Sequence, residues 1–98
     1  MEIYQNIELD KVYKAEHDTT VVAQLDATNK GRAVVEIIMI DSNDNEYRMA
    51  TASVHFYVQS DVFVLTNTAT TLIKKGERYK VVLDQGYPST TAHAYSRV

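Results

Sequence analysis

The chain has 98 residues, a length that suits one domain with a single hydrophobic core. Apolar residues make up 45% and charged residues 23%, shares that are typical of a globular protein and exclude a largely disordered one. The formal net charge is −3, and the ten Lys and Arg form no basic stripe, so we expect no nucleic-acid partner. Cysteine is absent, which excludes disulfides, thiolate nucleophiles and thiolate metal ligands.

The first residues, MEIYQNIELDKVYK, carry acids and amides where a secretory signal peptide needs a basic start followed by about 7–15 apolar residues. The longest apolar run, residues 33–40, is interrupted by Glu36 and is too short to cross a bilayer. We therefore expect neither secretion by a signal peptide nor a membrane partner. The expected location is the cytoplasm of the producing cell or a larger assembly formed there.

Helical spacing is hard to find, whereas β-branched and aromatic residues recur in short runs between Asp, Asn, Gly and Thr clusters. Residues 2–9 predict a first strand, and residues 12–14 predict a short continuation. The segment TTVVAQLDA, residues 19–27, alternates apolar and polar side chains as a half-buried strand does. Asn29 and Gly31 then tolerate the tight connection of a hairpin, which we predict between residues 19–27 and 33–41.

The second strand of that hairpin is apolar on both faces. Its inward set would be Ala33, Val35, Ile37 and Met39, but Val34, Ile38 and Ile40 on the opposite face are apolar as well. A strand covered on both sides, or a strand at a subunit contact, would explain this pattern.

The stretch MIDSNDNEYR places oxygen donors at alternate positions, Asp41, Asn43 and Asn45, as the start of a calcium loop does. An EF-hand needs glycine at the sixth position and a bidentate Glu at the twelfth, but these positions hold Glu46 and Ala52. The pattern favours a loop between strands whose Asp and Asn side chains bond their own backbone. A cation site of another kind at this turn stays open, and we assign no metal or cofactor.

The second half predicts a strand over residues 46–58 and a bulge or corner at residues 51–53. The inward residues of this strand would be Tyr47, Met49, Val54, Phe56 and Val58. Residues 62–66 predict a short buried strand. The segment NTATTLIKKGE, residues 67–77, is interpreted as a connection in which Leu72 plugs the core and Gly76 makes a tight turn.

The strand RYKVVLD, residues 78–84, completes a set of about seven short strands. This spacing is typical of a single antiparallel β-sandwich, either Ig-like or jelly-roll-like. Residues 85–98 hold the only proline and little aliphatic bulk, so we predict a β-sandwich domain over residues 1–84 and an extended C-terminal tail or arm over residues 85–98.

No catalytic arrangement stands out. His17, His55 and His93 are far apart in the sequence and lie in no zinc-binding spacing. There is no G-x-S-x-G elbow and no Gly-rich phosphate loop, and the paired acids of the 41–46 turn are predicted to be exposed. The sequence therefore predicts a protein that is not an enzyme.

Seven tyrosines and no tryptophan favour protein contacts, because tyrosine offers a rigid surface with a polar tip. The residues that we assign to such contacts are Val34, Ile38, Ile40, His55, Tyr57, Gln59, Tyr87 and Tyr95. We predict a structural or assembly protein that forms homo-oligomers or joins other protein subunits. A compact β domain with an arm resembles in architecture the minor structural proteins of bacteriophage virions, such as capsid decoration or tail proteins. The alternative is a small intracellular binding protein that inhibits or regulates a host protein.

Overall fold

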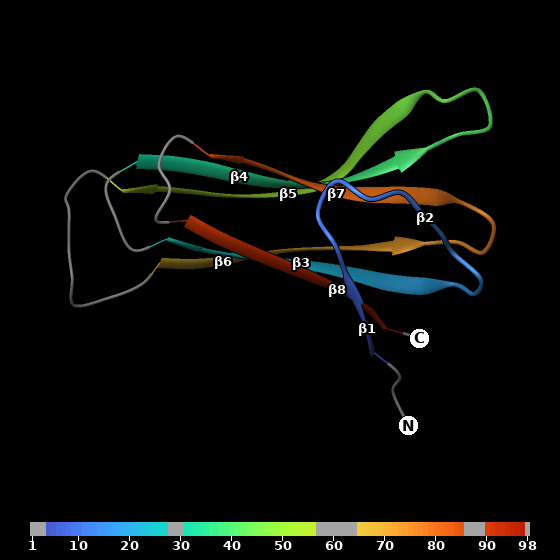
Figure 1. Cartoon of the computed structure of the whole chain (residues 1–98), viewed down its shortest axis with the longest axis horizontal. Coiled ribbons are helices and arrows are strands. Elements are labelled where there is room, and N and C mark those ends of the chain that lie inside the picture. Colours follow the sequence, from blue (N-terminus) through green and yellow to red (C-terminus); the bar gives the residue numbers. More distant parts are fainter. Residues whose placement is uncertain (1–3, 28–30, 57–64, 86–89, 98) are drawn as a thin grey trace.

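In the computed structural model, eight β-strands form two four-stranded sheets that pack face to face (Figure 1). The structure describes residues 4–27, 31–56, 65–85 and 90–97. The strands are β1 (Tyr4–Ile7), β2 (Tyr13–Lys14), β3 (Thr19–Ala27), β4 (Gly31–Ile40), β5 (Glu46–Phe56), β6 (Leu65–Ile73), β7 (Arg78–Gln85) and β8 (Thr90–Arg97). All neighbouring strands in these sheets are antiparallel, so the predicted β-sandwich is confirmed.

The strand order identifies the sandwich as a jelly roll. Sheet A has the order β1-β8-β3-β6, and sheet B has the order β2-β7-β4-β5. The chain doubles back at the β4–β5 hairpin, so that β5, β6, β7 and β8 pair in turn with β4, β3, β2 and β1. Rolling this long ribbon places β8 beside β3 and β7 beside β4, which gives the two interlocked Greek keys of a jelly roll.

The core lies between the sheets and follows from strict alternation along the central strands. Leu25 of β3 and Val35 and Ile37 of β4 are fully buried, as are Ile73 of β6 and Val81 of β7. Burying a side chain of this size contributes about 1.5–3 kcal/mol, and every second residue of these strands points into the same layer. Packing between the sheets is therefore the main source of stability in a chain without disulfides.

The predicted hairpin between residues 19–27 and 33–41 is wrong. Both strands exist, but β3 belongs to sheet A and β4 to sheet B, so they face each other across the core. Each strand has one face of small and branched apolar residues, and these two faces bury more surface when stacked than when placed edge to edge. The consecutive strands that do form a hairpin are β4 and β5.

The predicted C-terminal tail is also wrong, because residues 90–97 form β8, an inner strand of sheet A between β1 and β3. Its inward residues are Ala92, Ala94 and Ser96, which lie opposite Leu25, Ala23 and Val21 of β3. Small side chains are sufficient at Ala92 and Ser96 because Leu25 and Val21 of the neighbouring strand supply the bulk. The strand therefore lacks the aliphatic residues by which strands are recognised in a sequence.

The segment 67–77 is a strand for most of its length rather than a connection, because β6 extends to Ile73. The core position that we assigned to Leu72 belongs to its neighbour Ile73, and Leu72 lies on the outer surface with 56% exposure. Leu72 pairs with Thr20 of β3, whose side chain points to the same outer surface. The alternation thus places Leu72 and Ile73 on opposite faces.

The irregularity in β5 lies at Met49 rather than at residues 51–53. Ile37 pairs with Ala50 and Ile38 pairs with Arg48, which leaves Met49 as the extra residue of a bulge. The hairpin tip beyond the bulge bends away from sheet A (Figure 1), so Tyr47 and Met49 are 48% and 42% exposed. The expectation that both point into the core is therefore wrong, whereas Val54 is buried as expected.

Candidate functional site

The loop between β4 and β5 is held together by the carboxylate of Asp41. Its Oδ1 accepts hydrogen bonds from the backbone N–H groups of Asn43 at 2.8 Å and Asn45 at 2.9 Å. Its Oδ2 accepts from the Asn45 side-chain amide at 3.3 Å and from the Tyr47 hydroxyl at 3.1 Å. Both carboxylate oxygens of Asp41, the residue at the first position of the calcium-loop pattern, therefore accept hydrogen bonds from within the loop.

These contacts shift two ionisation equilibria. The N–H donor of Asn45 and the other loop donors lower the pKa of Asp41 below its usual value, because they stabilise the carboxylate. The same carboxylate raises the pKa of Tyr47, first through the hydrogen bond that the neutral phenol donates to it. The loop thus stabilises a charged Asp41 beside a protonated Tyr47.

The next acid of the loop is neutralised from outside it. Asp44 adopts the left-handed conformation, with φ of 64°, and its Oδ1 accepts from the Arg78 guanidinium at 2.8 Å. The same guanidinium nitrogen donates to the backbone carbonyl of Asp41. Across the described ranges 4–27, 31–56, 65–85 and 90–97, no group of three or more His, Asp or Glu is placed to hold a metal ion. The geometry is that of a structural turn.

The outer face of sheet B carries Val34, Ile38 and Ile40, which lie together on the outside of β4 as their spacing predicts. Val34 and Ile38 are half-buried, and Ile40 is only 7% exposed, which leaves Ile40 little surface to offer a partner. Lys80 pairs with Glu46 at 3.0 Å, and Arg48 pairs with Glu36 at 3.0 Å.

These two ion pairs flank Ile38 on the outer face of sheet B. Lys80 lies beside Ile38 on one side, and Arg48 lies beside it on the other. Long cationic side chains can lay their aliphatic stems over apolar neighbours while their charged ends remain in water. The outer face of sheet B is therefore a charged surface with apolar residues beneath it.

The outer face of sheet A, which we call face A, has a different character. Alternation opposite the buried residues of β3 places fourteen side chains on it: Tyr4, Asn6, Thr20, Val22, Gln24, Asp26, Thr66, Thr68, Thr70, Leu72, Thr91, His93, Tyr95 and Arg97. Asp26 and Arg97 are the only Asp, Glu, Lys or Arg residues among these described positions. Face A is thus a broad and almost uncharged β surface.

The carboxylate of Asp26, one of the two charged groups of face A, accepts hydrogen bonds from its neighbours on that face. Oδ1 of Asp26 accepts from the Thr66 hydroxyl at 2.7 Å, and Gln24 donates to both carboxylate oxygens at 3.3 and 3.2 Å. This corner of the face is therefore a hydrogen-bonded polar cluster rather than a free charge.

Tyrosine gives face A its apolar part. The rings of Tyr4 and Tyr95 meet edge to face with their centroids 5.5 Å apart. Tyr95 lies opposite Val22, which is only 6% exposed although it points away from the core. Tyr95, which we predicted to be a contact residue, thus lies on the outer surface of sheet A. Its position on an inner strand and its partner Tyr4 were not predicted.

Three predicted contact residues, Tyr57, Gln59 and Tyr87, lie outside the described residues, and His55 is described only as part of the β5 backbone. The structure therefore leaves the predicted patch of His55, Tyr57 and Gln59 as a prediction. Thr68 and Thr70 of face A were missed because residues 67–77 were interpreted as a connection. Their spacing of two in LTNTATTLI is the signal that could have identified them.

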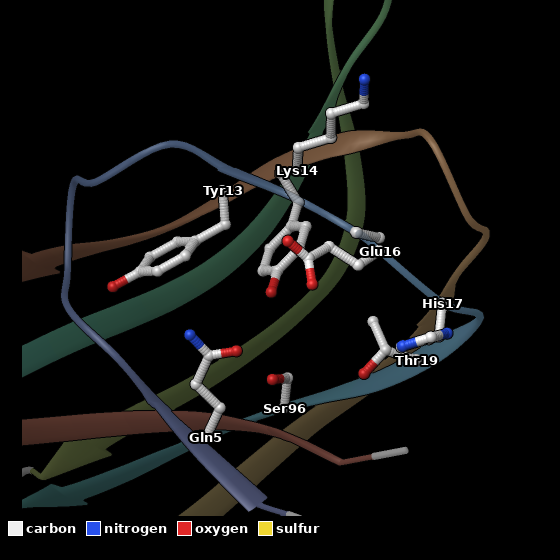
Figure 2. Close-up of a pocket in the computed structure, with 9 residues that line it drawn as sticks. Gln5, Tyr13, Lys14, Glu16, His17, Thr19 and Ser96 are labelled. Carbon is white, nitrogen blue, oxygen red and sulfur yellow. The ribbon is translucent and has the colours of Figure 1, made fainter.

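A pocket of about 230 Å³ opens at one end of the sandwich, between the start of β1, the short β2 and the end of β8 (Figure 2). Glu16 and His17 lie at its mouth, and Gln5 and Ser96 face it from sheet A. The buried ring of Tyr79 stacks on Tyr13 behind them, with centroids 5.8 Å apart. The volume is below the roughly 300–1,000 Å³ of typical small-molecule sites.

The hydroxyl groups of the pocket are used within the fold. Thr19 donates to the carbonyl oxygen of Arg97 at 2.9 Å, and the Tyr13 hydroxyl accepts from the backbone N–H of Glu8 at 3.0 Å. Burial raises the pKa of Tyr79, so its phenol keeps its proton at neutral pH. In the part of the chain that the structure describes, neither Thr19 nor Ser96 has the hydrogen bond to a His or carboxylate base that activates a nucleophile.

Comparison with protein-family models, with curated proteins and with solved structures finds no match to the chain. In the described residues, no helix has the length and apolar character needed to cross a membrane. Inference about function therefore starts from face A, the pocket and the fold alone.

Proposed function

We propose that this protein is a non-enzymatic, self-associating structural protein, specifically a virion component such as a bacteriophage capsid decoration or tail protein, and that face A is its contact surface. The observation that carries the proposal is the contrast between the two outer faces. Face A is depleted of charge and contains tyrosine, the composition of interface centres, whereas the outer face of sheet B is crossed by ion pairs. Leu72 adds a large apolar side chain at 56% exposure.

The fold supports the virion part of the proposal by analogy. Jelly rolls of eight strands recur in viral capsid and lectin domains. The internally bonded hydroxyls of Thr19 and Tyr13 in the pocket support a non-enzymatic protein.

A pair of matched substitutions tests the contact surface. Leu72→Lys places a charge on face A, and Val34→Lys places the same charge on the outer face of sheet B beside Asp84. Analytical ultracentrifugation of the full chain should show weaker self-association for the first variant and unchanged association for the second. Equal effects, or a larger effect of Val34→Lys, would reject face A as the contact surface.

The virion assignment has its own test. Mass spectrometry of particles purified from the native source should detect this chain at a fixed ratio to the main coat protein. Recovery of the chain only from the soluble fraction would reject a virion role and leave a free intracellular protein.

A further inference from the structure

The edge strand β6 differs from the other edges of the sandwich. The described edge strands are β1 and β6 in sheet A and β2 and β5 in sheet B. β1 is described over four residues, β2 has two, and β5 carries the Met49 bulge and the charged residues Glu46 and Arg48. These are the usual devices that prevent edge-to-edge pairing. β6 has nine residues, LTNTATTLI, with no charge, no proline and an unbroken register against β3.

Side-chain contacts show which backbone groups of β6 face the open edge. The N–H of Thr68 donates to Oδ1 of its neighbour Asn67 at 2.9 Å, so it does not point toward β3. Alternate residues of an antiparallel strand direct their N–H and C=O to the same side. The open edge is therefore formed by the even-numbered residues 66–72.

We propose that two copies of this chain pair antiparallel along β6, with Ala69 on the two-fold axis, so that the A sheets join into one continuous sheet. This inference rests on the proposed self-association and names its geometry. In this register Thr68 of one copy lies opposite Thr70 of the other, and Thr66 lies opposite Leu72. Each of these pairs exchanges two backbone hydrogen bonds.

Three features of β6 favour a second copy as the occupant. First, the Ala69-centred register is the one that pairs all nine described residues of β6, because Leu65 then lies opposite Ile73 of the other copy. Second, Ala69 meets its own copy at a non-hydrogen-bonded position, where Cα atoms approach to about 4.5 Å and a small side chain fits best. Third, an uncharged strand brings no like charges together when it pairs with itself.

A proline substitution at the open edge tests the pairing. Thr70→Pro removes an N–H that points outward and leaves the ladder to β3 intact, which is the position where edge strands tolerate proline. Thr70→Val keeps the N–H and serves as the matched control. In sedimentation equilibrium of the full chain, we expect Thr70→Pro to weaken dimerisation by at least about tenfold and Thr70→Val to leave it within about twofold. A Thr70→Pro protein that is folded by circular dichroism and dimerises like the wild type would overturn the proposal.

A charge exchange tests the register without proline. The double variant Thr68→Lys with Thr70→Lys places lysine opposite lysine across the two-fold axis, whereas Thr68→Lys with Thr70→Glu places lysine opposite glutamate. The proposal predicts that the variant with two lysines is monomeric and that the variant with lysine and glutamate dimerises at least as well as the wild type. Equal association of the two variants would overturn the β6 pairing while leaving self-association through another surface intact. A wild-type chain that stays monomeric would instead reject the proposed function itself.

Discussion

Asn67 of β6 joins the open edges of the two sheets through Ser53 of β5. Its Nδ2 donates to the backbone carbonyl oxygen of Ser53 at 2.9 Å, while its Oδ1 accepts from the N–H of Thr68. The Asn67 side chain thus satisfies the carbonyl oxygen of Ser53 at the edge of sheet B and the N–H of Thr68 at the edge of sheet A. An added strand on β6 would need the Thr68 N–H, so Asn67 competes with the proposed pairing.

Asn67→Ala should therefore have two effects of opposite sign. Loss of the two hydrogen bonds should lower the stability of the monomer by roughly 0.5–1.5 kcal/mol, because both are exposed. Release of the Thr68 N–H should strengthen dimerisation. Urea unfolding at low concentration measures the first effect, and sedimentation equilibrium measures the second.

Asn67→Asp is the control for this prediction, because it keeps an acceptor for Thr68 and loses the donor to Ser53. It should lower monomer stability without strengthening the dimer. Dimers of Asn67→Ala that are weaker than wild type would show that Asn67 supports association rather than competing with it.

Asp41→Ala should loosen the hairpin tip, because it removes the acceptor of four hydrogen bonds. We expect a lower melting temperature and faster amide exchange at Asn43 and Asn45. Asp41→Asn keeps one carbonyl oxygen and should show a smaller effect. Millimolar calcium should leave the melting temperature of the wild type unchanged, because both carboxylate oxygens already accept internal donors. A calcium-dependent increase would contradict the interpretation of this loop as a structural turn.

The same carboxylate predicts a specific dependence of stability on pH. The pKa of Asp41 is lowered in the folded protein from its usual 3.8, chiefly by the N–H of Asn45, so the unfolded chain binds this proton first as the pH falls. The stabilising contribution is complete above about pH 5 and is lost as the pH falls through the folded value. Thermal melts between about pH 2 and pH 6 should show a smaller acid loss for Asp41→Asn than for the wild type. If the melting temperatures of wild type and Asp41→Asn fall equally with pH, the ionised Asp41 makes no such contribution to stability.

The core can be tested at Leu25, which is fully buried between the sheets. Leu25→Ala should lower the free energy of unfolding by about 2–5 kcal/mol, a large part of the roughly 5–15 kcal/mol of a small domain. Val12→Ala, at a residue with 48% exposure, should change it by no more than about 0.5 kcal/mol. Denaturant titration of both variants measures this difference, and similar losses would contradict the assigned core.

The sandwich could be predicted because its central strands alternate cleanly. Val21 and Leu25 are spaced as a half-buried strand requires, and both are fully buried. The turn at Gly76 could also be predicted, since its φ of 92° is a conformation that glycine adopts without strain. The spacing around Asp41 likewise favoured a turn, in agreement with its observed hydrogen bonds.

The jelly-roll order could not be predicted in the same way, because strand partners depend on contacts between distant segments. The apolar faces of β3 and β4 are equally compatible with a hairpin and with stacking across the core. The last strand was missed because Ala92 and Ala94 need no bulk beside Leu25. Face A was missed for a related reason, since Thr68 and Thr70 resemble loop residues until β3 is known to lie beside them.

The measurement that tests self-association most directly is sedimentation equilibrium of the full wild-type chain over a concentration range from about 1 μM to 1 mM. The proposed use of face A and of the β6 edge predicts a reversible shift from monomer to dimer or larger species within this range. A single monomeric species at every concentration would contradict it.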